Sequence, residues 1–537
     1  MKNYLVSNCS TVVFKVKQIL SFLLKILATL PHKSFFIRMG KLLRNFEKLP
    51  IFYPLAMILV STILFGRLLL SEGTYGMYSD WPIPPLNLQI KQQVVQDVFF
   101  VWSPNYLGYE RVRQAGNYID LVSLVVSYVF GVGGEVISKY PIALLFLIPQ
   151  ISYFVFRKFN IERFYSFVGS LYYSLCVPFL FDSLISGYLK FIVSYSAFPL
   201  FLWYLYKLVI SEKFNTKNFV FFTLSYIAVA TSLNFFFIVL LPIVVFFFLG
   251  LLKRKLDIKF GALLAGQLAL SMLLTVLTQS TAFFIPVYDL VFKSSGEGIR
   301  SLQSGLITFL TFSHPVTLNA FRQFSASINF YERNYPIYGR EYLLSNLYFS
   351  VSLSLIFISV IFNSKKRDLH IMGFYICAVL SVFILKGINS PFGAINAVFY
   401  KLPLMAVLRN ISYITFITGF SYAFLLAYSS QNVQKLIRLK YAHHLFRIAL
   451  LLLLYVGIYP LRHSEFFETL KTFKVHDEEA SLYRSLQSEK GSYYVYNIPH
   501  LSPFYYKDAM GNLIGPGFNT FVSNPAKPSL YSGMLLV

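Results

Sequence analysis

The chain has 537 residues, of which 56% are hydrophobic and only 13% are charged, with a formal net charge of +24. Soluble domains carry about 25% charged residues, so this composition excludes a water-exposed globular protein. Apolar stretches near twenty residues recur between basic clusters, which is the pattern of helices that cross a hydrocarbon core about 30 Å thick.

The sequence predicts an all-α transmembrane fold, a polytopic helical bundle of about 11 spans. Backbone polar groups must be satisfied inside the bilayer, which favours helices, and the alternating pattern of a membrane β-barrel is absent. We divide the chain into a basic leader (1–48), a transmembrane domain (49–460) and a small C-terminal extracytoplasmic segment (461–537). The long extracytoplasmic loops include the first loop, 71–120.

The leader is apolar over residues 12–30 but is interrupted by Lys15, Lys17 and Lys25. This pattern predicts an amphipathic helix that lies on the inner membrane surface. A crossing helix is the alternative, and it would add one span and change the orientation argument.

The predicted spans follow in chain order. They are 51–70, 140–156, 164–181, 188–209, two helices within 218–250 that turn near 232–234, 260–277, 343–362, 371–385, 411–428 and a short helix at 448–459. Residues 121–132 are apolar but are interrupted at Gly131, Gly133 and Gly134, which favours a half-span or an interfacial helix.

The basic residues indicate the orientation, because Lys and Arg near membrane ends accumulate on the cytoplasmic side. With the N-terminus in the cytoplasm, six mostly short segments collect 26 of the 47 basic residues. The first loop and the tail are then extracytoplasmic. The net charge reflects topology and contact with anionic lipid, so the bilayer is a predicted partner and nucleic acid is not.

The first loop is the most unusual segment, since loops between spans are usually short. It is about fifty residues long and carries two Trp and five carboxylates: Glu72, Asp80, Asp97, Glu110 and Asp120. Its length and its carboxylates indicate a reaction or binding site at the membrane surface. We expect it to form short helices, at 94–100 for example, packed against residues 278–341, where 306–312 is a similar apolar run.

No cofactor is predicted. The three cysteines, Cys9, Cys176 and Cys377, lie in the leader or in spans, so they imply no disulfide framework in the external loops. The sequence has no HExxH, no Walker A motif and no GxGxxG. It has no Asp-x-Asp pair to argue for a metal, although a divalent metal stays an open alternative.

Several short motifs resemble the GT-C superfamily of membrane glycosyltransferases, in particular its arabinofuranosyltransferase-type and related archaeal and bacterial members. The motifs are YSDWP ending at Pro82, FVWSPNYLG ending at Gly108, DSLISGY starting at Asp182, KGINSPFG starting at Lys386 and LPLMAVLRN starting at Leu402. The resemblance covers roughly residues 50–430. The chain departs from it at Ser79, where many relatives have Gly, and in lacking a large C-terminal soluble region.

The resemblance implies sugar transfer from a polyprenyl-phosphate donor to a glycan, lipid or protein acceptor on the outer face, with inversion. A sugar hydroxyl is a poor nucleophile, so a carboxylate at the membrane surface would take its proton as general base. Asp80 is the first candidate, and Asp97 and Glu110 are the reserves. A turn or helix cap is the structural alternative for Asp80.

Arginines are candidates for the carrier phosphate, because guanidinium pairs bidentately with phosphate oxygens. The candidates are Arg111, Arg113 and Arg409, for which snorkelling to lipid headgroups is the alternative. Trp81 and Trp102 are candidates for stacking on a sugar ring, and anchoring in the interfacial aromatic belt is the alternative for both.

Two other classes of function stay open. A transporter or flippase of lipid-linked sugars would need charged residues in a cavity at mid-membrane, whereas the charges Arg67 and Lys190 lie close to span ends. A non-catalytic scaffold would explain the spans but not the acidic first loop. The tail has globular composition, as in a piece of an α/β domain, and its alternating Tyr493, Tyr494 and Tyr496 predict a strand.

Overall fold

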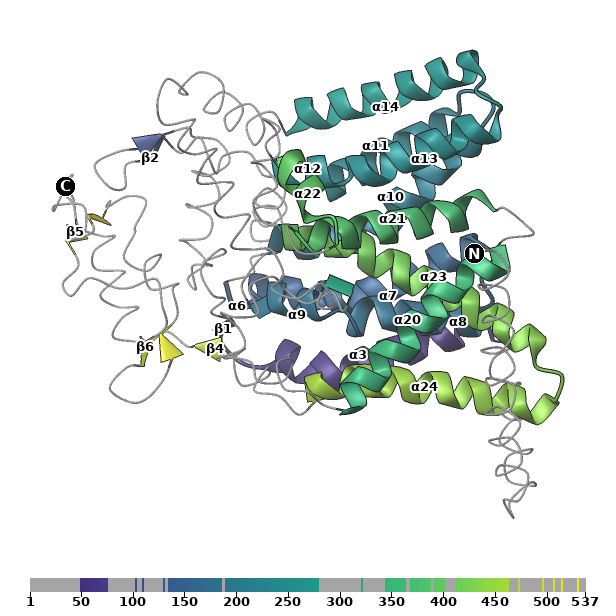
Figure 1. Cartoon of the computed structure of the whole chain (residues 1–537). Coiled ribbons are helices and arrows are strands. Elements are labelled where there is room, and N and C mark those ends of the chain that lie inside the picture. The colour runs from purple at the N-terminus through teal and green to yellow at the C-terminus, as the bar shows by residue number, and fades with distance from the viewer. Residues whose placement is uncertain are drawn as a thin grey trace.

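The computed structural model shows a bundle of long apolar helices with short strands beyond one of its ends (Figure 1). The structure describes residues 49–75, 102–103, 109–110, 129–130, 134–185, 189–279, 320–321, 343–363, 368–387, 391–400, 411–462, 472–473, 495–496, 506–507, 513–514 and 529–530. The leader and residues 121–128 lie outside this part of the chain, so the predictions made for them stay predictions.

The described helices follow in chain order. They are α3 (Phe52–Leu70), α6 (Gly134–Ile137), α7 (Tyr140–Lys158), α8 (Arg163–Leu175), α9 (Pro178–Ile185), α10 (Leu189–Ile210), α11 (Thr216–Val229), α12 (Leu233–Ile238), α13 (Leu240–Lys253), α14 (Ile258–Thr278), α20 (Leu343–Asn363), α21 (Leu369–Leu385), α22 (Gly393–Tyr400), the 3₁₀ turn η5 (Ile411–Ile414), α23 (Thr415–Leu436) and α24 (Lys440–Arg462).

Within the described residues, seven helices are long and apolar enough to cross a membrane. They are 52–70, 140–158, 190–210, 233–253, 258–278, 411–436 and 441–458. The chain therefore has the helices of a polytopic membrane protein, and the count of eleven spans stays a prediction.

Two predicted spans differ from the helices in the structure. The span predicted at 164–181 is divided into α8 and α9, which begins at Pro178. Proline has no N–H to donate but is tolerated at the start of a helix. The short span predicted at 448–459 is the longer α24. The predicted turn near 232–234 is confirmed, since α11 ends at Val229 and Ser232 precedes α12.

The centre of the bundle is α23, which packs against α8, α20 and α21. Every residue from Thr415 to Gln431 is buried. Close approach of α8 depends on Gly169, because a Cβ there would lie 2.9 Å from the Ala423 carbonyl oxygen. Small residues at such contacts let helix backbones approach in membranes.

Aromatic rings fill the space around α23. The Phe374 and Phe424 ring centroids lie 4.5 Å apart. Between α8 and α10, the Tyr173 and Tyr195 rings stack at 4.1 Å, and each hydroxyl donates to the backbone carbonyl of the other residue. These reciprocal bonds satisfy two hydroxyls that would otherwise be costly to bury.

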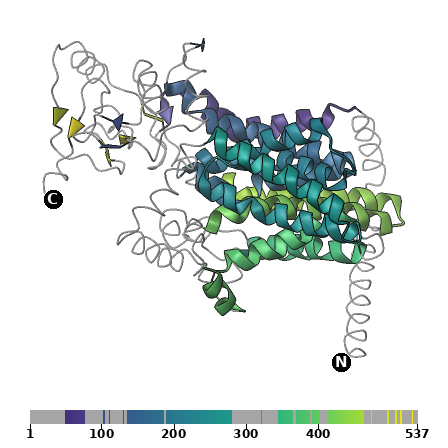
Figure 2. The same cartoon turned by 90° about the horizontal axis from the view of Figure 1, so that it is seen from above.

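The two ends of the bundle carry different segments of the chain, as Figures 1 and 2 show. We call the end where α3 and α21 finish and α7 begins the loop end. The opposite end carries the α7–α8, α10–α11, α13–α14 and α23–α24 turns, and we call it the basic end. Its basic residues are Arg157, Lys158, Arg163, Lys207, Lys213, Lys217, Lys253, Arg254, Lys255, Lys259, Lys435, Arg438, Lys440 and Arg447. The four described segments that were predicted to share one side of the membrane therefore share one end of the bundle.

The described parts of the first loop and of the tail form strands of two residues each. They are β1 (Thr74–Tyr75), β2 (Trp102–Ser103), β3 (Tyr109–Glu110), β4 (Thr472–Phe473), β5 (Val495–Tyr496), β6 (Tyr506–Lys507), β7 (Leu513–Ile514) and β8 (Ser529–Leu530). β1 pairs with β4, β2 with β3 and β6 with β7, all antiparallel, while β5 and β8 are parallel. β5 includes Tyr496, in the region where a strand was predicted.

The expectation of short helices in the first loop is wrong for the residues described there, since all three described elements beyond Gly73 are strands. Thr, Tyr and Trp are residues that favour strands. The predicted packing against 278–341 and the runs 94–100 and 306–312 lie outside the described residues.

Candidate functional site

The loop end gathers the start of the first loop and part of the tail. Lys139, which precedes α7, donates from Nζ to the carbonyl oxygen of Ser71, directly after α3. Directly after Gly73, which has a φ of 93°, β1 pairs with β4, and Thr74 is the backbone partner of Phe473. The loop therefore begins at a fixed point between α3, α7 and the tail (Figure 1).

The predicted site residues are only partly covered by the structure. Asp80, Trp81, Asp97, Arg111, Arg113 and Arg409 lie outside the described residues. Trp102 and Glu110 are backbone partners across the β2–β3 hairpin. The structure thus pairs the backbones of one residue predicted to stack on a sugar and one predicted carboxylate.

Lys386 is a loop-end residue to which the sequence analysis gave no role, although it opens the KGINSPFG motif. It follows the last residue of α21, is 3% exposed, and holds its ammonium 4.7 Å from the Phe383 ring centroid. Burial lowers the pKa of this ammonium below its ordinary value. A lysine at the end of an apolar helix is expected to extend to water, so only the tertiary structure shows that this one is buried.

The segment after Lys386 is held by one side chain. Asn396 of α22 is 2% exposed, and its Nδ2 donates to the carbonyl oxygens of Phe383, at 2.8 Å, and of Gly387, at 2.6 Å. Gly387 has a φ of 61°, in a region that glycine adopts at little cost. α22 is therefore folded back onto the end of α21.

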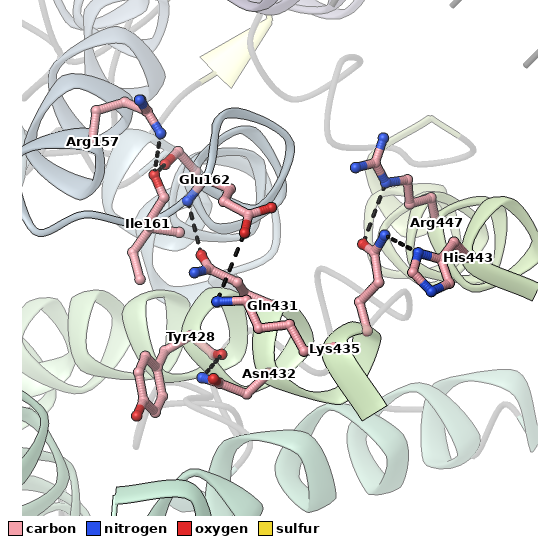
Figure 3. A network of polar contacts seen from close by, with 11 residues as sticks. Arg157, Ile161, Glu162, Tyr428, Gln431, Asn432, Lys435, His443 and Arg447 are labelled. Carbon is pink, nitrogen blue, oxygen red and sulfur yellow. Dashed lines mark hydrogen bonds and ion pairs between the residues drawn. The ribbon is translucent and has the colours of Figure 1, made fainter. Parts of the chain in front are cut away.

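The basic end carries a polar network that joins α8, α23 and α24 (Figure 3). The backbone N–H of Glu162 donates to Gln431 Oε1 at 2.8 Å, and the Glu162 carboxylate lies 3.8 Å from Lys435 Nζ. Arg157 donates to the carbonyl oxygen of Ile161. These contacts tie the α7–α8 turn to the end of α23.

On the other side of α23, Gln434 connects to α24. Its Oε1 accepts from Arg447 Nε at 3.3 Å, and its Nε2 lies 3.0 Å from His443 Nδ1. His443 Nε2 lies 2.6 Å from the Ile437 carbonyl oxygen, so Nε2 donates and Nδ1 accepts. The network holds the ends of α8, α23 and α24 together, which is a structural role.

No metal site is visible in the part of the chain that the structure describes, which has no group of three His, Cys, Asp or Glu side chains able to hold an ion. The described cysteines, Cys176 and Cys377, are both buried in the bundle.

In comparisons with known proteins, no family model matches the chain, and no curated protein matches it. Two solved structures of the Archaeoglobus fulgidus oligosaccharyltransferase, one in the apo form and one in complex with Zn and sulfate, are similar to it. Their TM-scores are 0.48 and 0.45, with 12% and 13% sequence identity. The matches cover 82% and 80% of this chain but 58% and 55% of those chains.

Proposed function

We propose that this chain is a membrane glycosyltransferase that moves a sugar from a polyprenyl-phosphate donor to a glycan, lipid or protein acceptor on the outer face of the membrane. The observation that carries the proposal is the position of the first loop. It begins at the loop end between α3, α7 and the tail, opposite the basic end. A lipid-linked sugar in the outer leaflet would reach the loop at that level, and the GT-C-like motifs support the same reading.

In the proposed reaction, an acceptor hydroxyl attacks the anomeric carbon of the donor sugar. The C–O bond to phosphate breaks, the polyprenyl phosphate leaves with the electron pair, and the hydroxyl proton passes to the Asp80 carboxylate. This displacement inverts the anomeric centre. Asp97 and Glu110 are the alternative bases, and the proposal requires no metal ion.

The leaving phosphate gains negative charge in this step, so cations near it stabilise the transition state. Arg111, Arg113 and Arg409 are the proposed partners of the phosphate. Trp81 and Trp102 are the proposed platforms for the sugar ring. Of these five residues, Trp102 has a described backbone, directly opposite Glu110.

The test is a transfer assay on the full chain in lipid nanodiscs, with radiolabelled sugars on polyprenyl phosphate as donors and envelope glycans as acceptors. We expect Asp80→Asn, which keeps the shape of the side chain, to lower turnover by on the order of 10²–10⁴. The matched control, Glu162→Gln, removes a carboxylate from the basic end and should keep the parent rate.

An Asp80→Asn protein that transfers sugar at the parent rate would make Asp80 structural and direct attention to Asp97 and Glu110. A folded parent protein that releases no polyprenyl phosphate from any of these donors would overturn the proposed reaction. Transfer from nucleotide sugars instead would assign the donor to a different class.

A further inference from the structure

The two halves of the basic end use their cations differently. At the α7–α8 and α23–α24 turns, cations contact groups of the protein itself: Lys435 Nζ lies 3.8 Å from the Glu162 carboxylate, and Arg447 donates to Gln434. At the α10–α11 and α13–α14 turns, five lysines are exposed, and their ammonium groups make no ion pair with another described residue. They are Lys213, Lys217, Lys253, Lys255 and Lys259, and we call them the lysine patch.

One arginine holds these two turns together. Arg254 Nη1 lies 2.8 Å from Glu212 Oε1, and Nη2 donates to the carbonyl oxygen of Ile210 at 3.2 Å. The same guanidinium lies 5.3 Å from the centroid of the Phe260 ring. Because these contacts join the end of α10 to the start of α14, the lysine patch belongs to one surface and not to two separate turns.

The two acidic residues of these turns both serve the local structure. Glu212 forms the ion pair that joins the turns, and Asp257 Oδ1 accepts from the backbone N–H of Lys259 at 2.9 Å, so that it caps α14. Lys217 and Lys259 lie in the first turns of α11 and α14, where the helix dipole disfavours a positive charge. Helix stability therefore does not account for the lysine patch.

Exposed apolar side chains lie among these lysines. Phe214, Leu256 and Ile258 are 52%, 63% and 84% exposed. Leu256 has a φ of 61°, which is uncommon for a residue with a large side chain, and its backbone N–H donates to the carbonyl oxygen of Leu251 at 2.8 Å. The backbone of the turn thus keeps Leu256 outside the core of the bundle.

The lengths of the helices place this surface at the level of lipid headgroups. It joins the ends of three helices that are long and apolar enough to cross a membrane, 190–210, 233–253 and 258–278, each of 21 residues. At about 1.5 Å per residue, such a helix is roughly as long as the hydrocarbon core is thick. Cations at its end attract anionic lipid, and exposed apolar side chains there insert between headgroups.

We propose that the lysine patch, with Phe214, Leu256 and Ile258, forms a binding surface for anionic phospholipid. The ammonium groups contact the lipid phosphates, and the apolar side chains insert between the headgroups. Charge complementarity selects this partner, because residues 211–217 and 253–259 contain six basic and two acidic side chains. A general excess of positive charge would gather anionic lipid around the whole basic end, whereas this surface localises it to one half. The inference is independent of the proposed function.

The test compares two variants that lose the same charge from the two halves of the basic end. The first carries Lys253→Gln, Lys255→Gln and Lys259→Gln. The control carries Lys158→Gln, Lys435→Gln and Arg438→Gln, which are also exposed positions. Native mass spectrometry of the full chain, titrated with phosphatidylglycerol and with phosphatidylcholine, gives an apparent Kd for each lipid.

We expect the parent protein to bind phosphatidylglycerol more tightly than phosphatidylcholine. A cation near an anionic surface contributes about fivefold, so the first variant should lose at least roughly tenfold in affinity for phosphatidylglycerol, and the control should keep the parent's preference. Equal losses in both variants would assign the preference to the total charge and overturn the proposed surface. A parent without any preference would overturn the lipid as partner, and a preference that persists in high salt would contradict the role of the ammonium groups.

The apolar side chains are tested by Ile258→Ser, which leaves the charge unchanged. This variant should bind both lipids more weakly, because it loses an inserted side chain. Binding of both lipids at the parent affinity would remove the apolar side chains from the proposal.

Photolabelling of the unmutated chain in nanodiscs avoids any folding defect of the variants. Phosphatidylglycerol with a diazirine near its glycerol should label peptides that contain residues 210–217 and 252–260 more than those that contain 434–442. Excess phosphatidylglycerol should suppress this labelling, and excess phosphatidylcholine should not. Labelling concentrated on 434–442 would overturn the proposal.

Discussion

The basic end and the loop end of this bundle place charged side chains in different surroundings. At the basic end, charged side chains lie in short turns, are partly exposed, and contact acidic or amide partners, as in the Glu162–Gln431–Lys435 group. At the loop end, Lys386 is covered by protein, and strands from distant parts of the chain meet. Exposed cations in short turns can keep their hydration, whereas a cation that the fold covers has to be compensated by the protein around it.

The largest expected effect tests which end faces the cytoplasm. A reporter active only outside the cytoplasm should be active when fused after Val537 and inactive when inserted after Lys213 in the α10–α11 turn. The difference should be all or none, because the described start of the tail, β4, lies at the loop end and the α10–α11 turn lies at the basic end. Activity at both positions, or at the Lys213 insertion alone, would contradict the assigned orientation.

The next prediction compares two variants, each of which loses one side-chain amide at one end of the bundle. Asn396→Ala leaves the Phe383 and Gly387 carbonyls without their partner and should lower the free energy of unfolding by about 1–3 kcal/mol. Gln431→Ala removes a single acceptor from the Glu162 N–H and should cost about 0.5–1.5 kcal/mol. Hydrogen exchange should increase at residues 383–400 in the first variant and at 161–163 in the second. Increased exchange at both ends in either variant would show that the ends are coupled.

The smallest expected effect concerns an exposed ion pair of the basic end. Arg254 Nη1 lies 2.8 Å from Glu212 Oε1, and this hydrogen bond lowers the pKa of the carboxyl below its ordinary value. Because the folded-state pKa is the lower one, the pair stabilises the protein at neutral pH, and this contribution disappears as the pH falls through that pKa. Thermal unfolding of Glu212→Gln should show a slight loss at neutral pH and low salt, and none in acid. A loss that persists in acid or in high salt would point to packing instead.

The sequence by itself determined where most of the long helices of the bundle lie. Hydropathy located them because a bilayer offers no partner for an unpaired backbone group, so any long apolar segment must satisfy its own hydrogen bonds as a helix. The predicted spans at 51–70, 260–277 and 343–362 lie within a few residues of α3, α14 and α20. The length of the apolar segment 218–250 and its polar residues near 232–234 likewise predicted two helices with a turn between them.

The candidate site could be predicted only in part. The carboxylates and aromatic residues of the first loop stand out by composition, but the pairing of Trp102 with Glu110 depends on a hairpin of two-residue strands. A strand of two residues is too short to show the alternation of apolar and polar residues that predicts a strand. The β1–β4 pairing joins segments nearly four hundred positions apart in the sequence, so neither segment contains the signal for it.

Only the tertiary structure decided the state of Lys386. In the sequence it is a lysine directly after an apolar segment, the common arrangement of a side chain that reaches water at a helix end. In the structure Asn396 draws α22 back over the end of α21, and the same ammonium becomes buried beside Phe383. The hydrogen bonds that produce this burial join residues 383, 387 and 396 across a turn, and local sequence patterns do not encode such contacts because they depend on where the second helix packs.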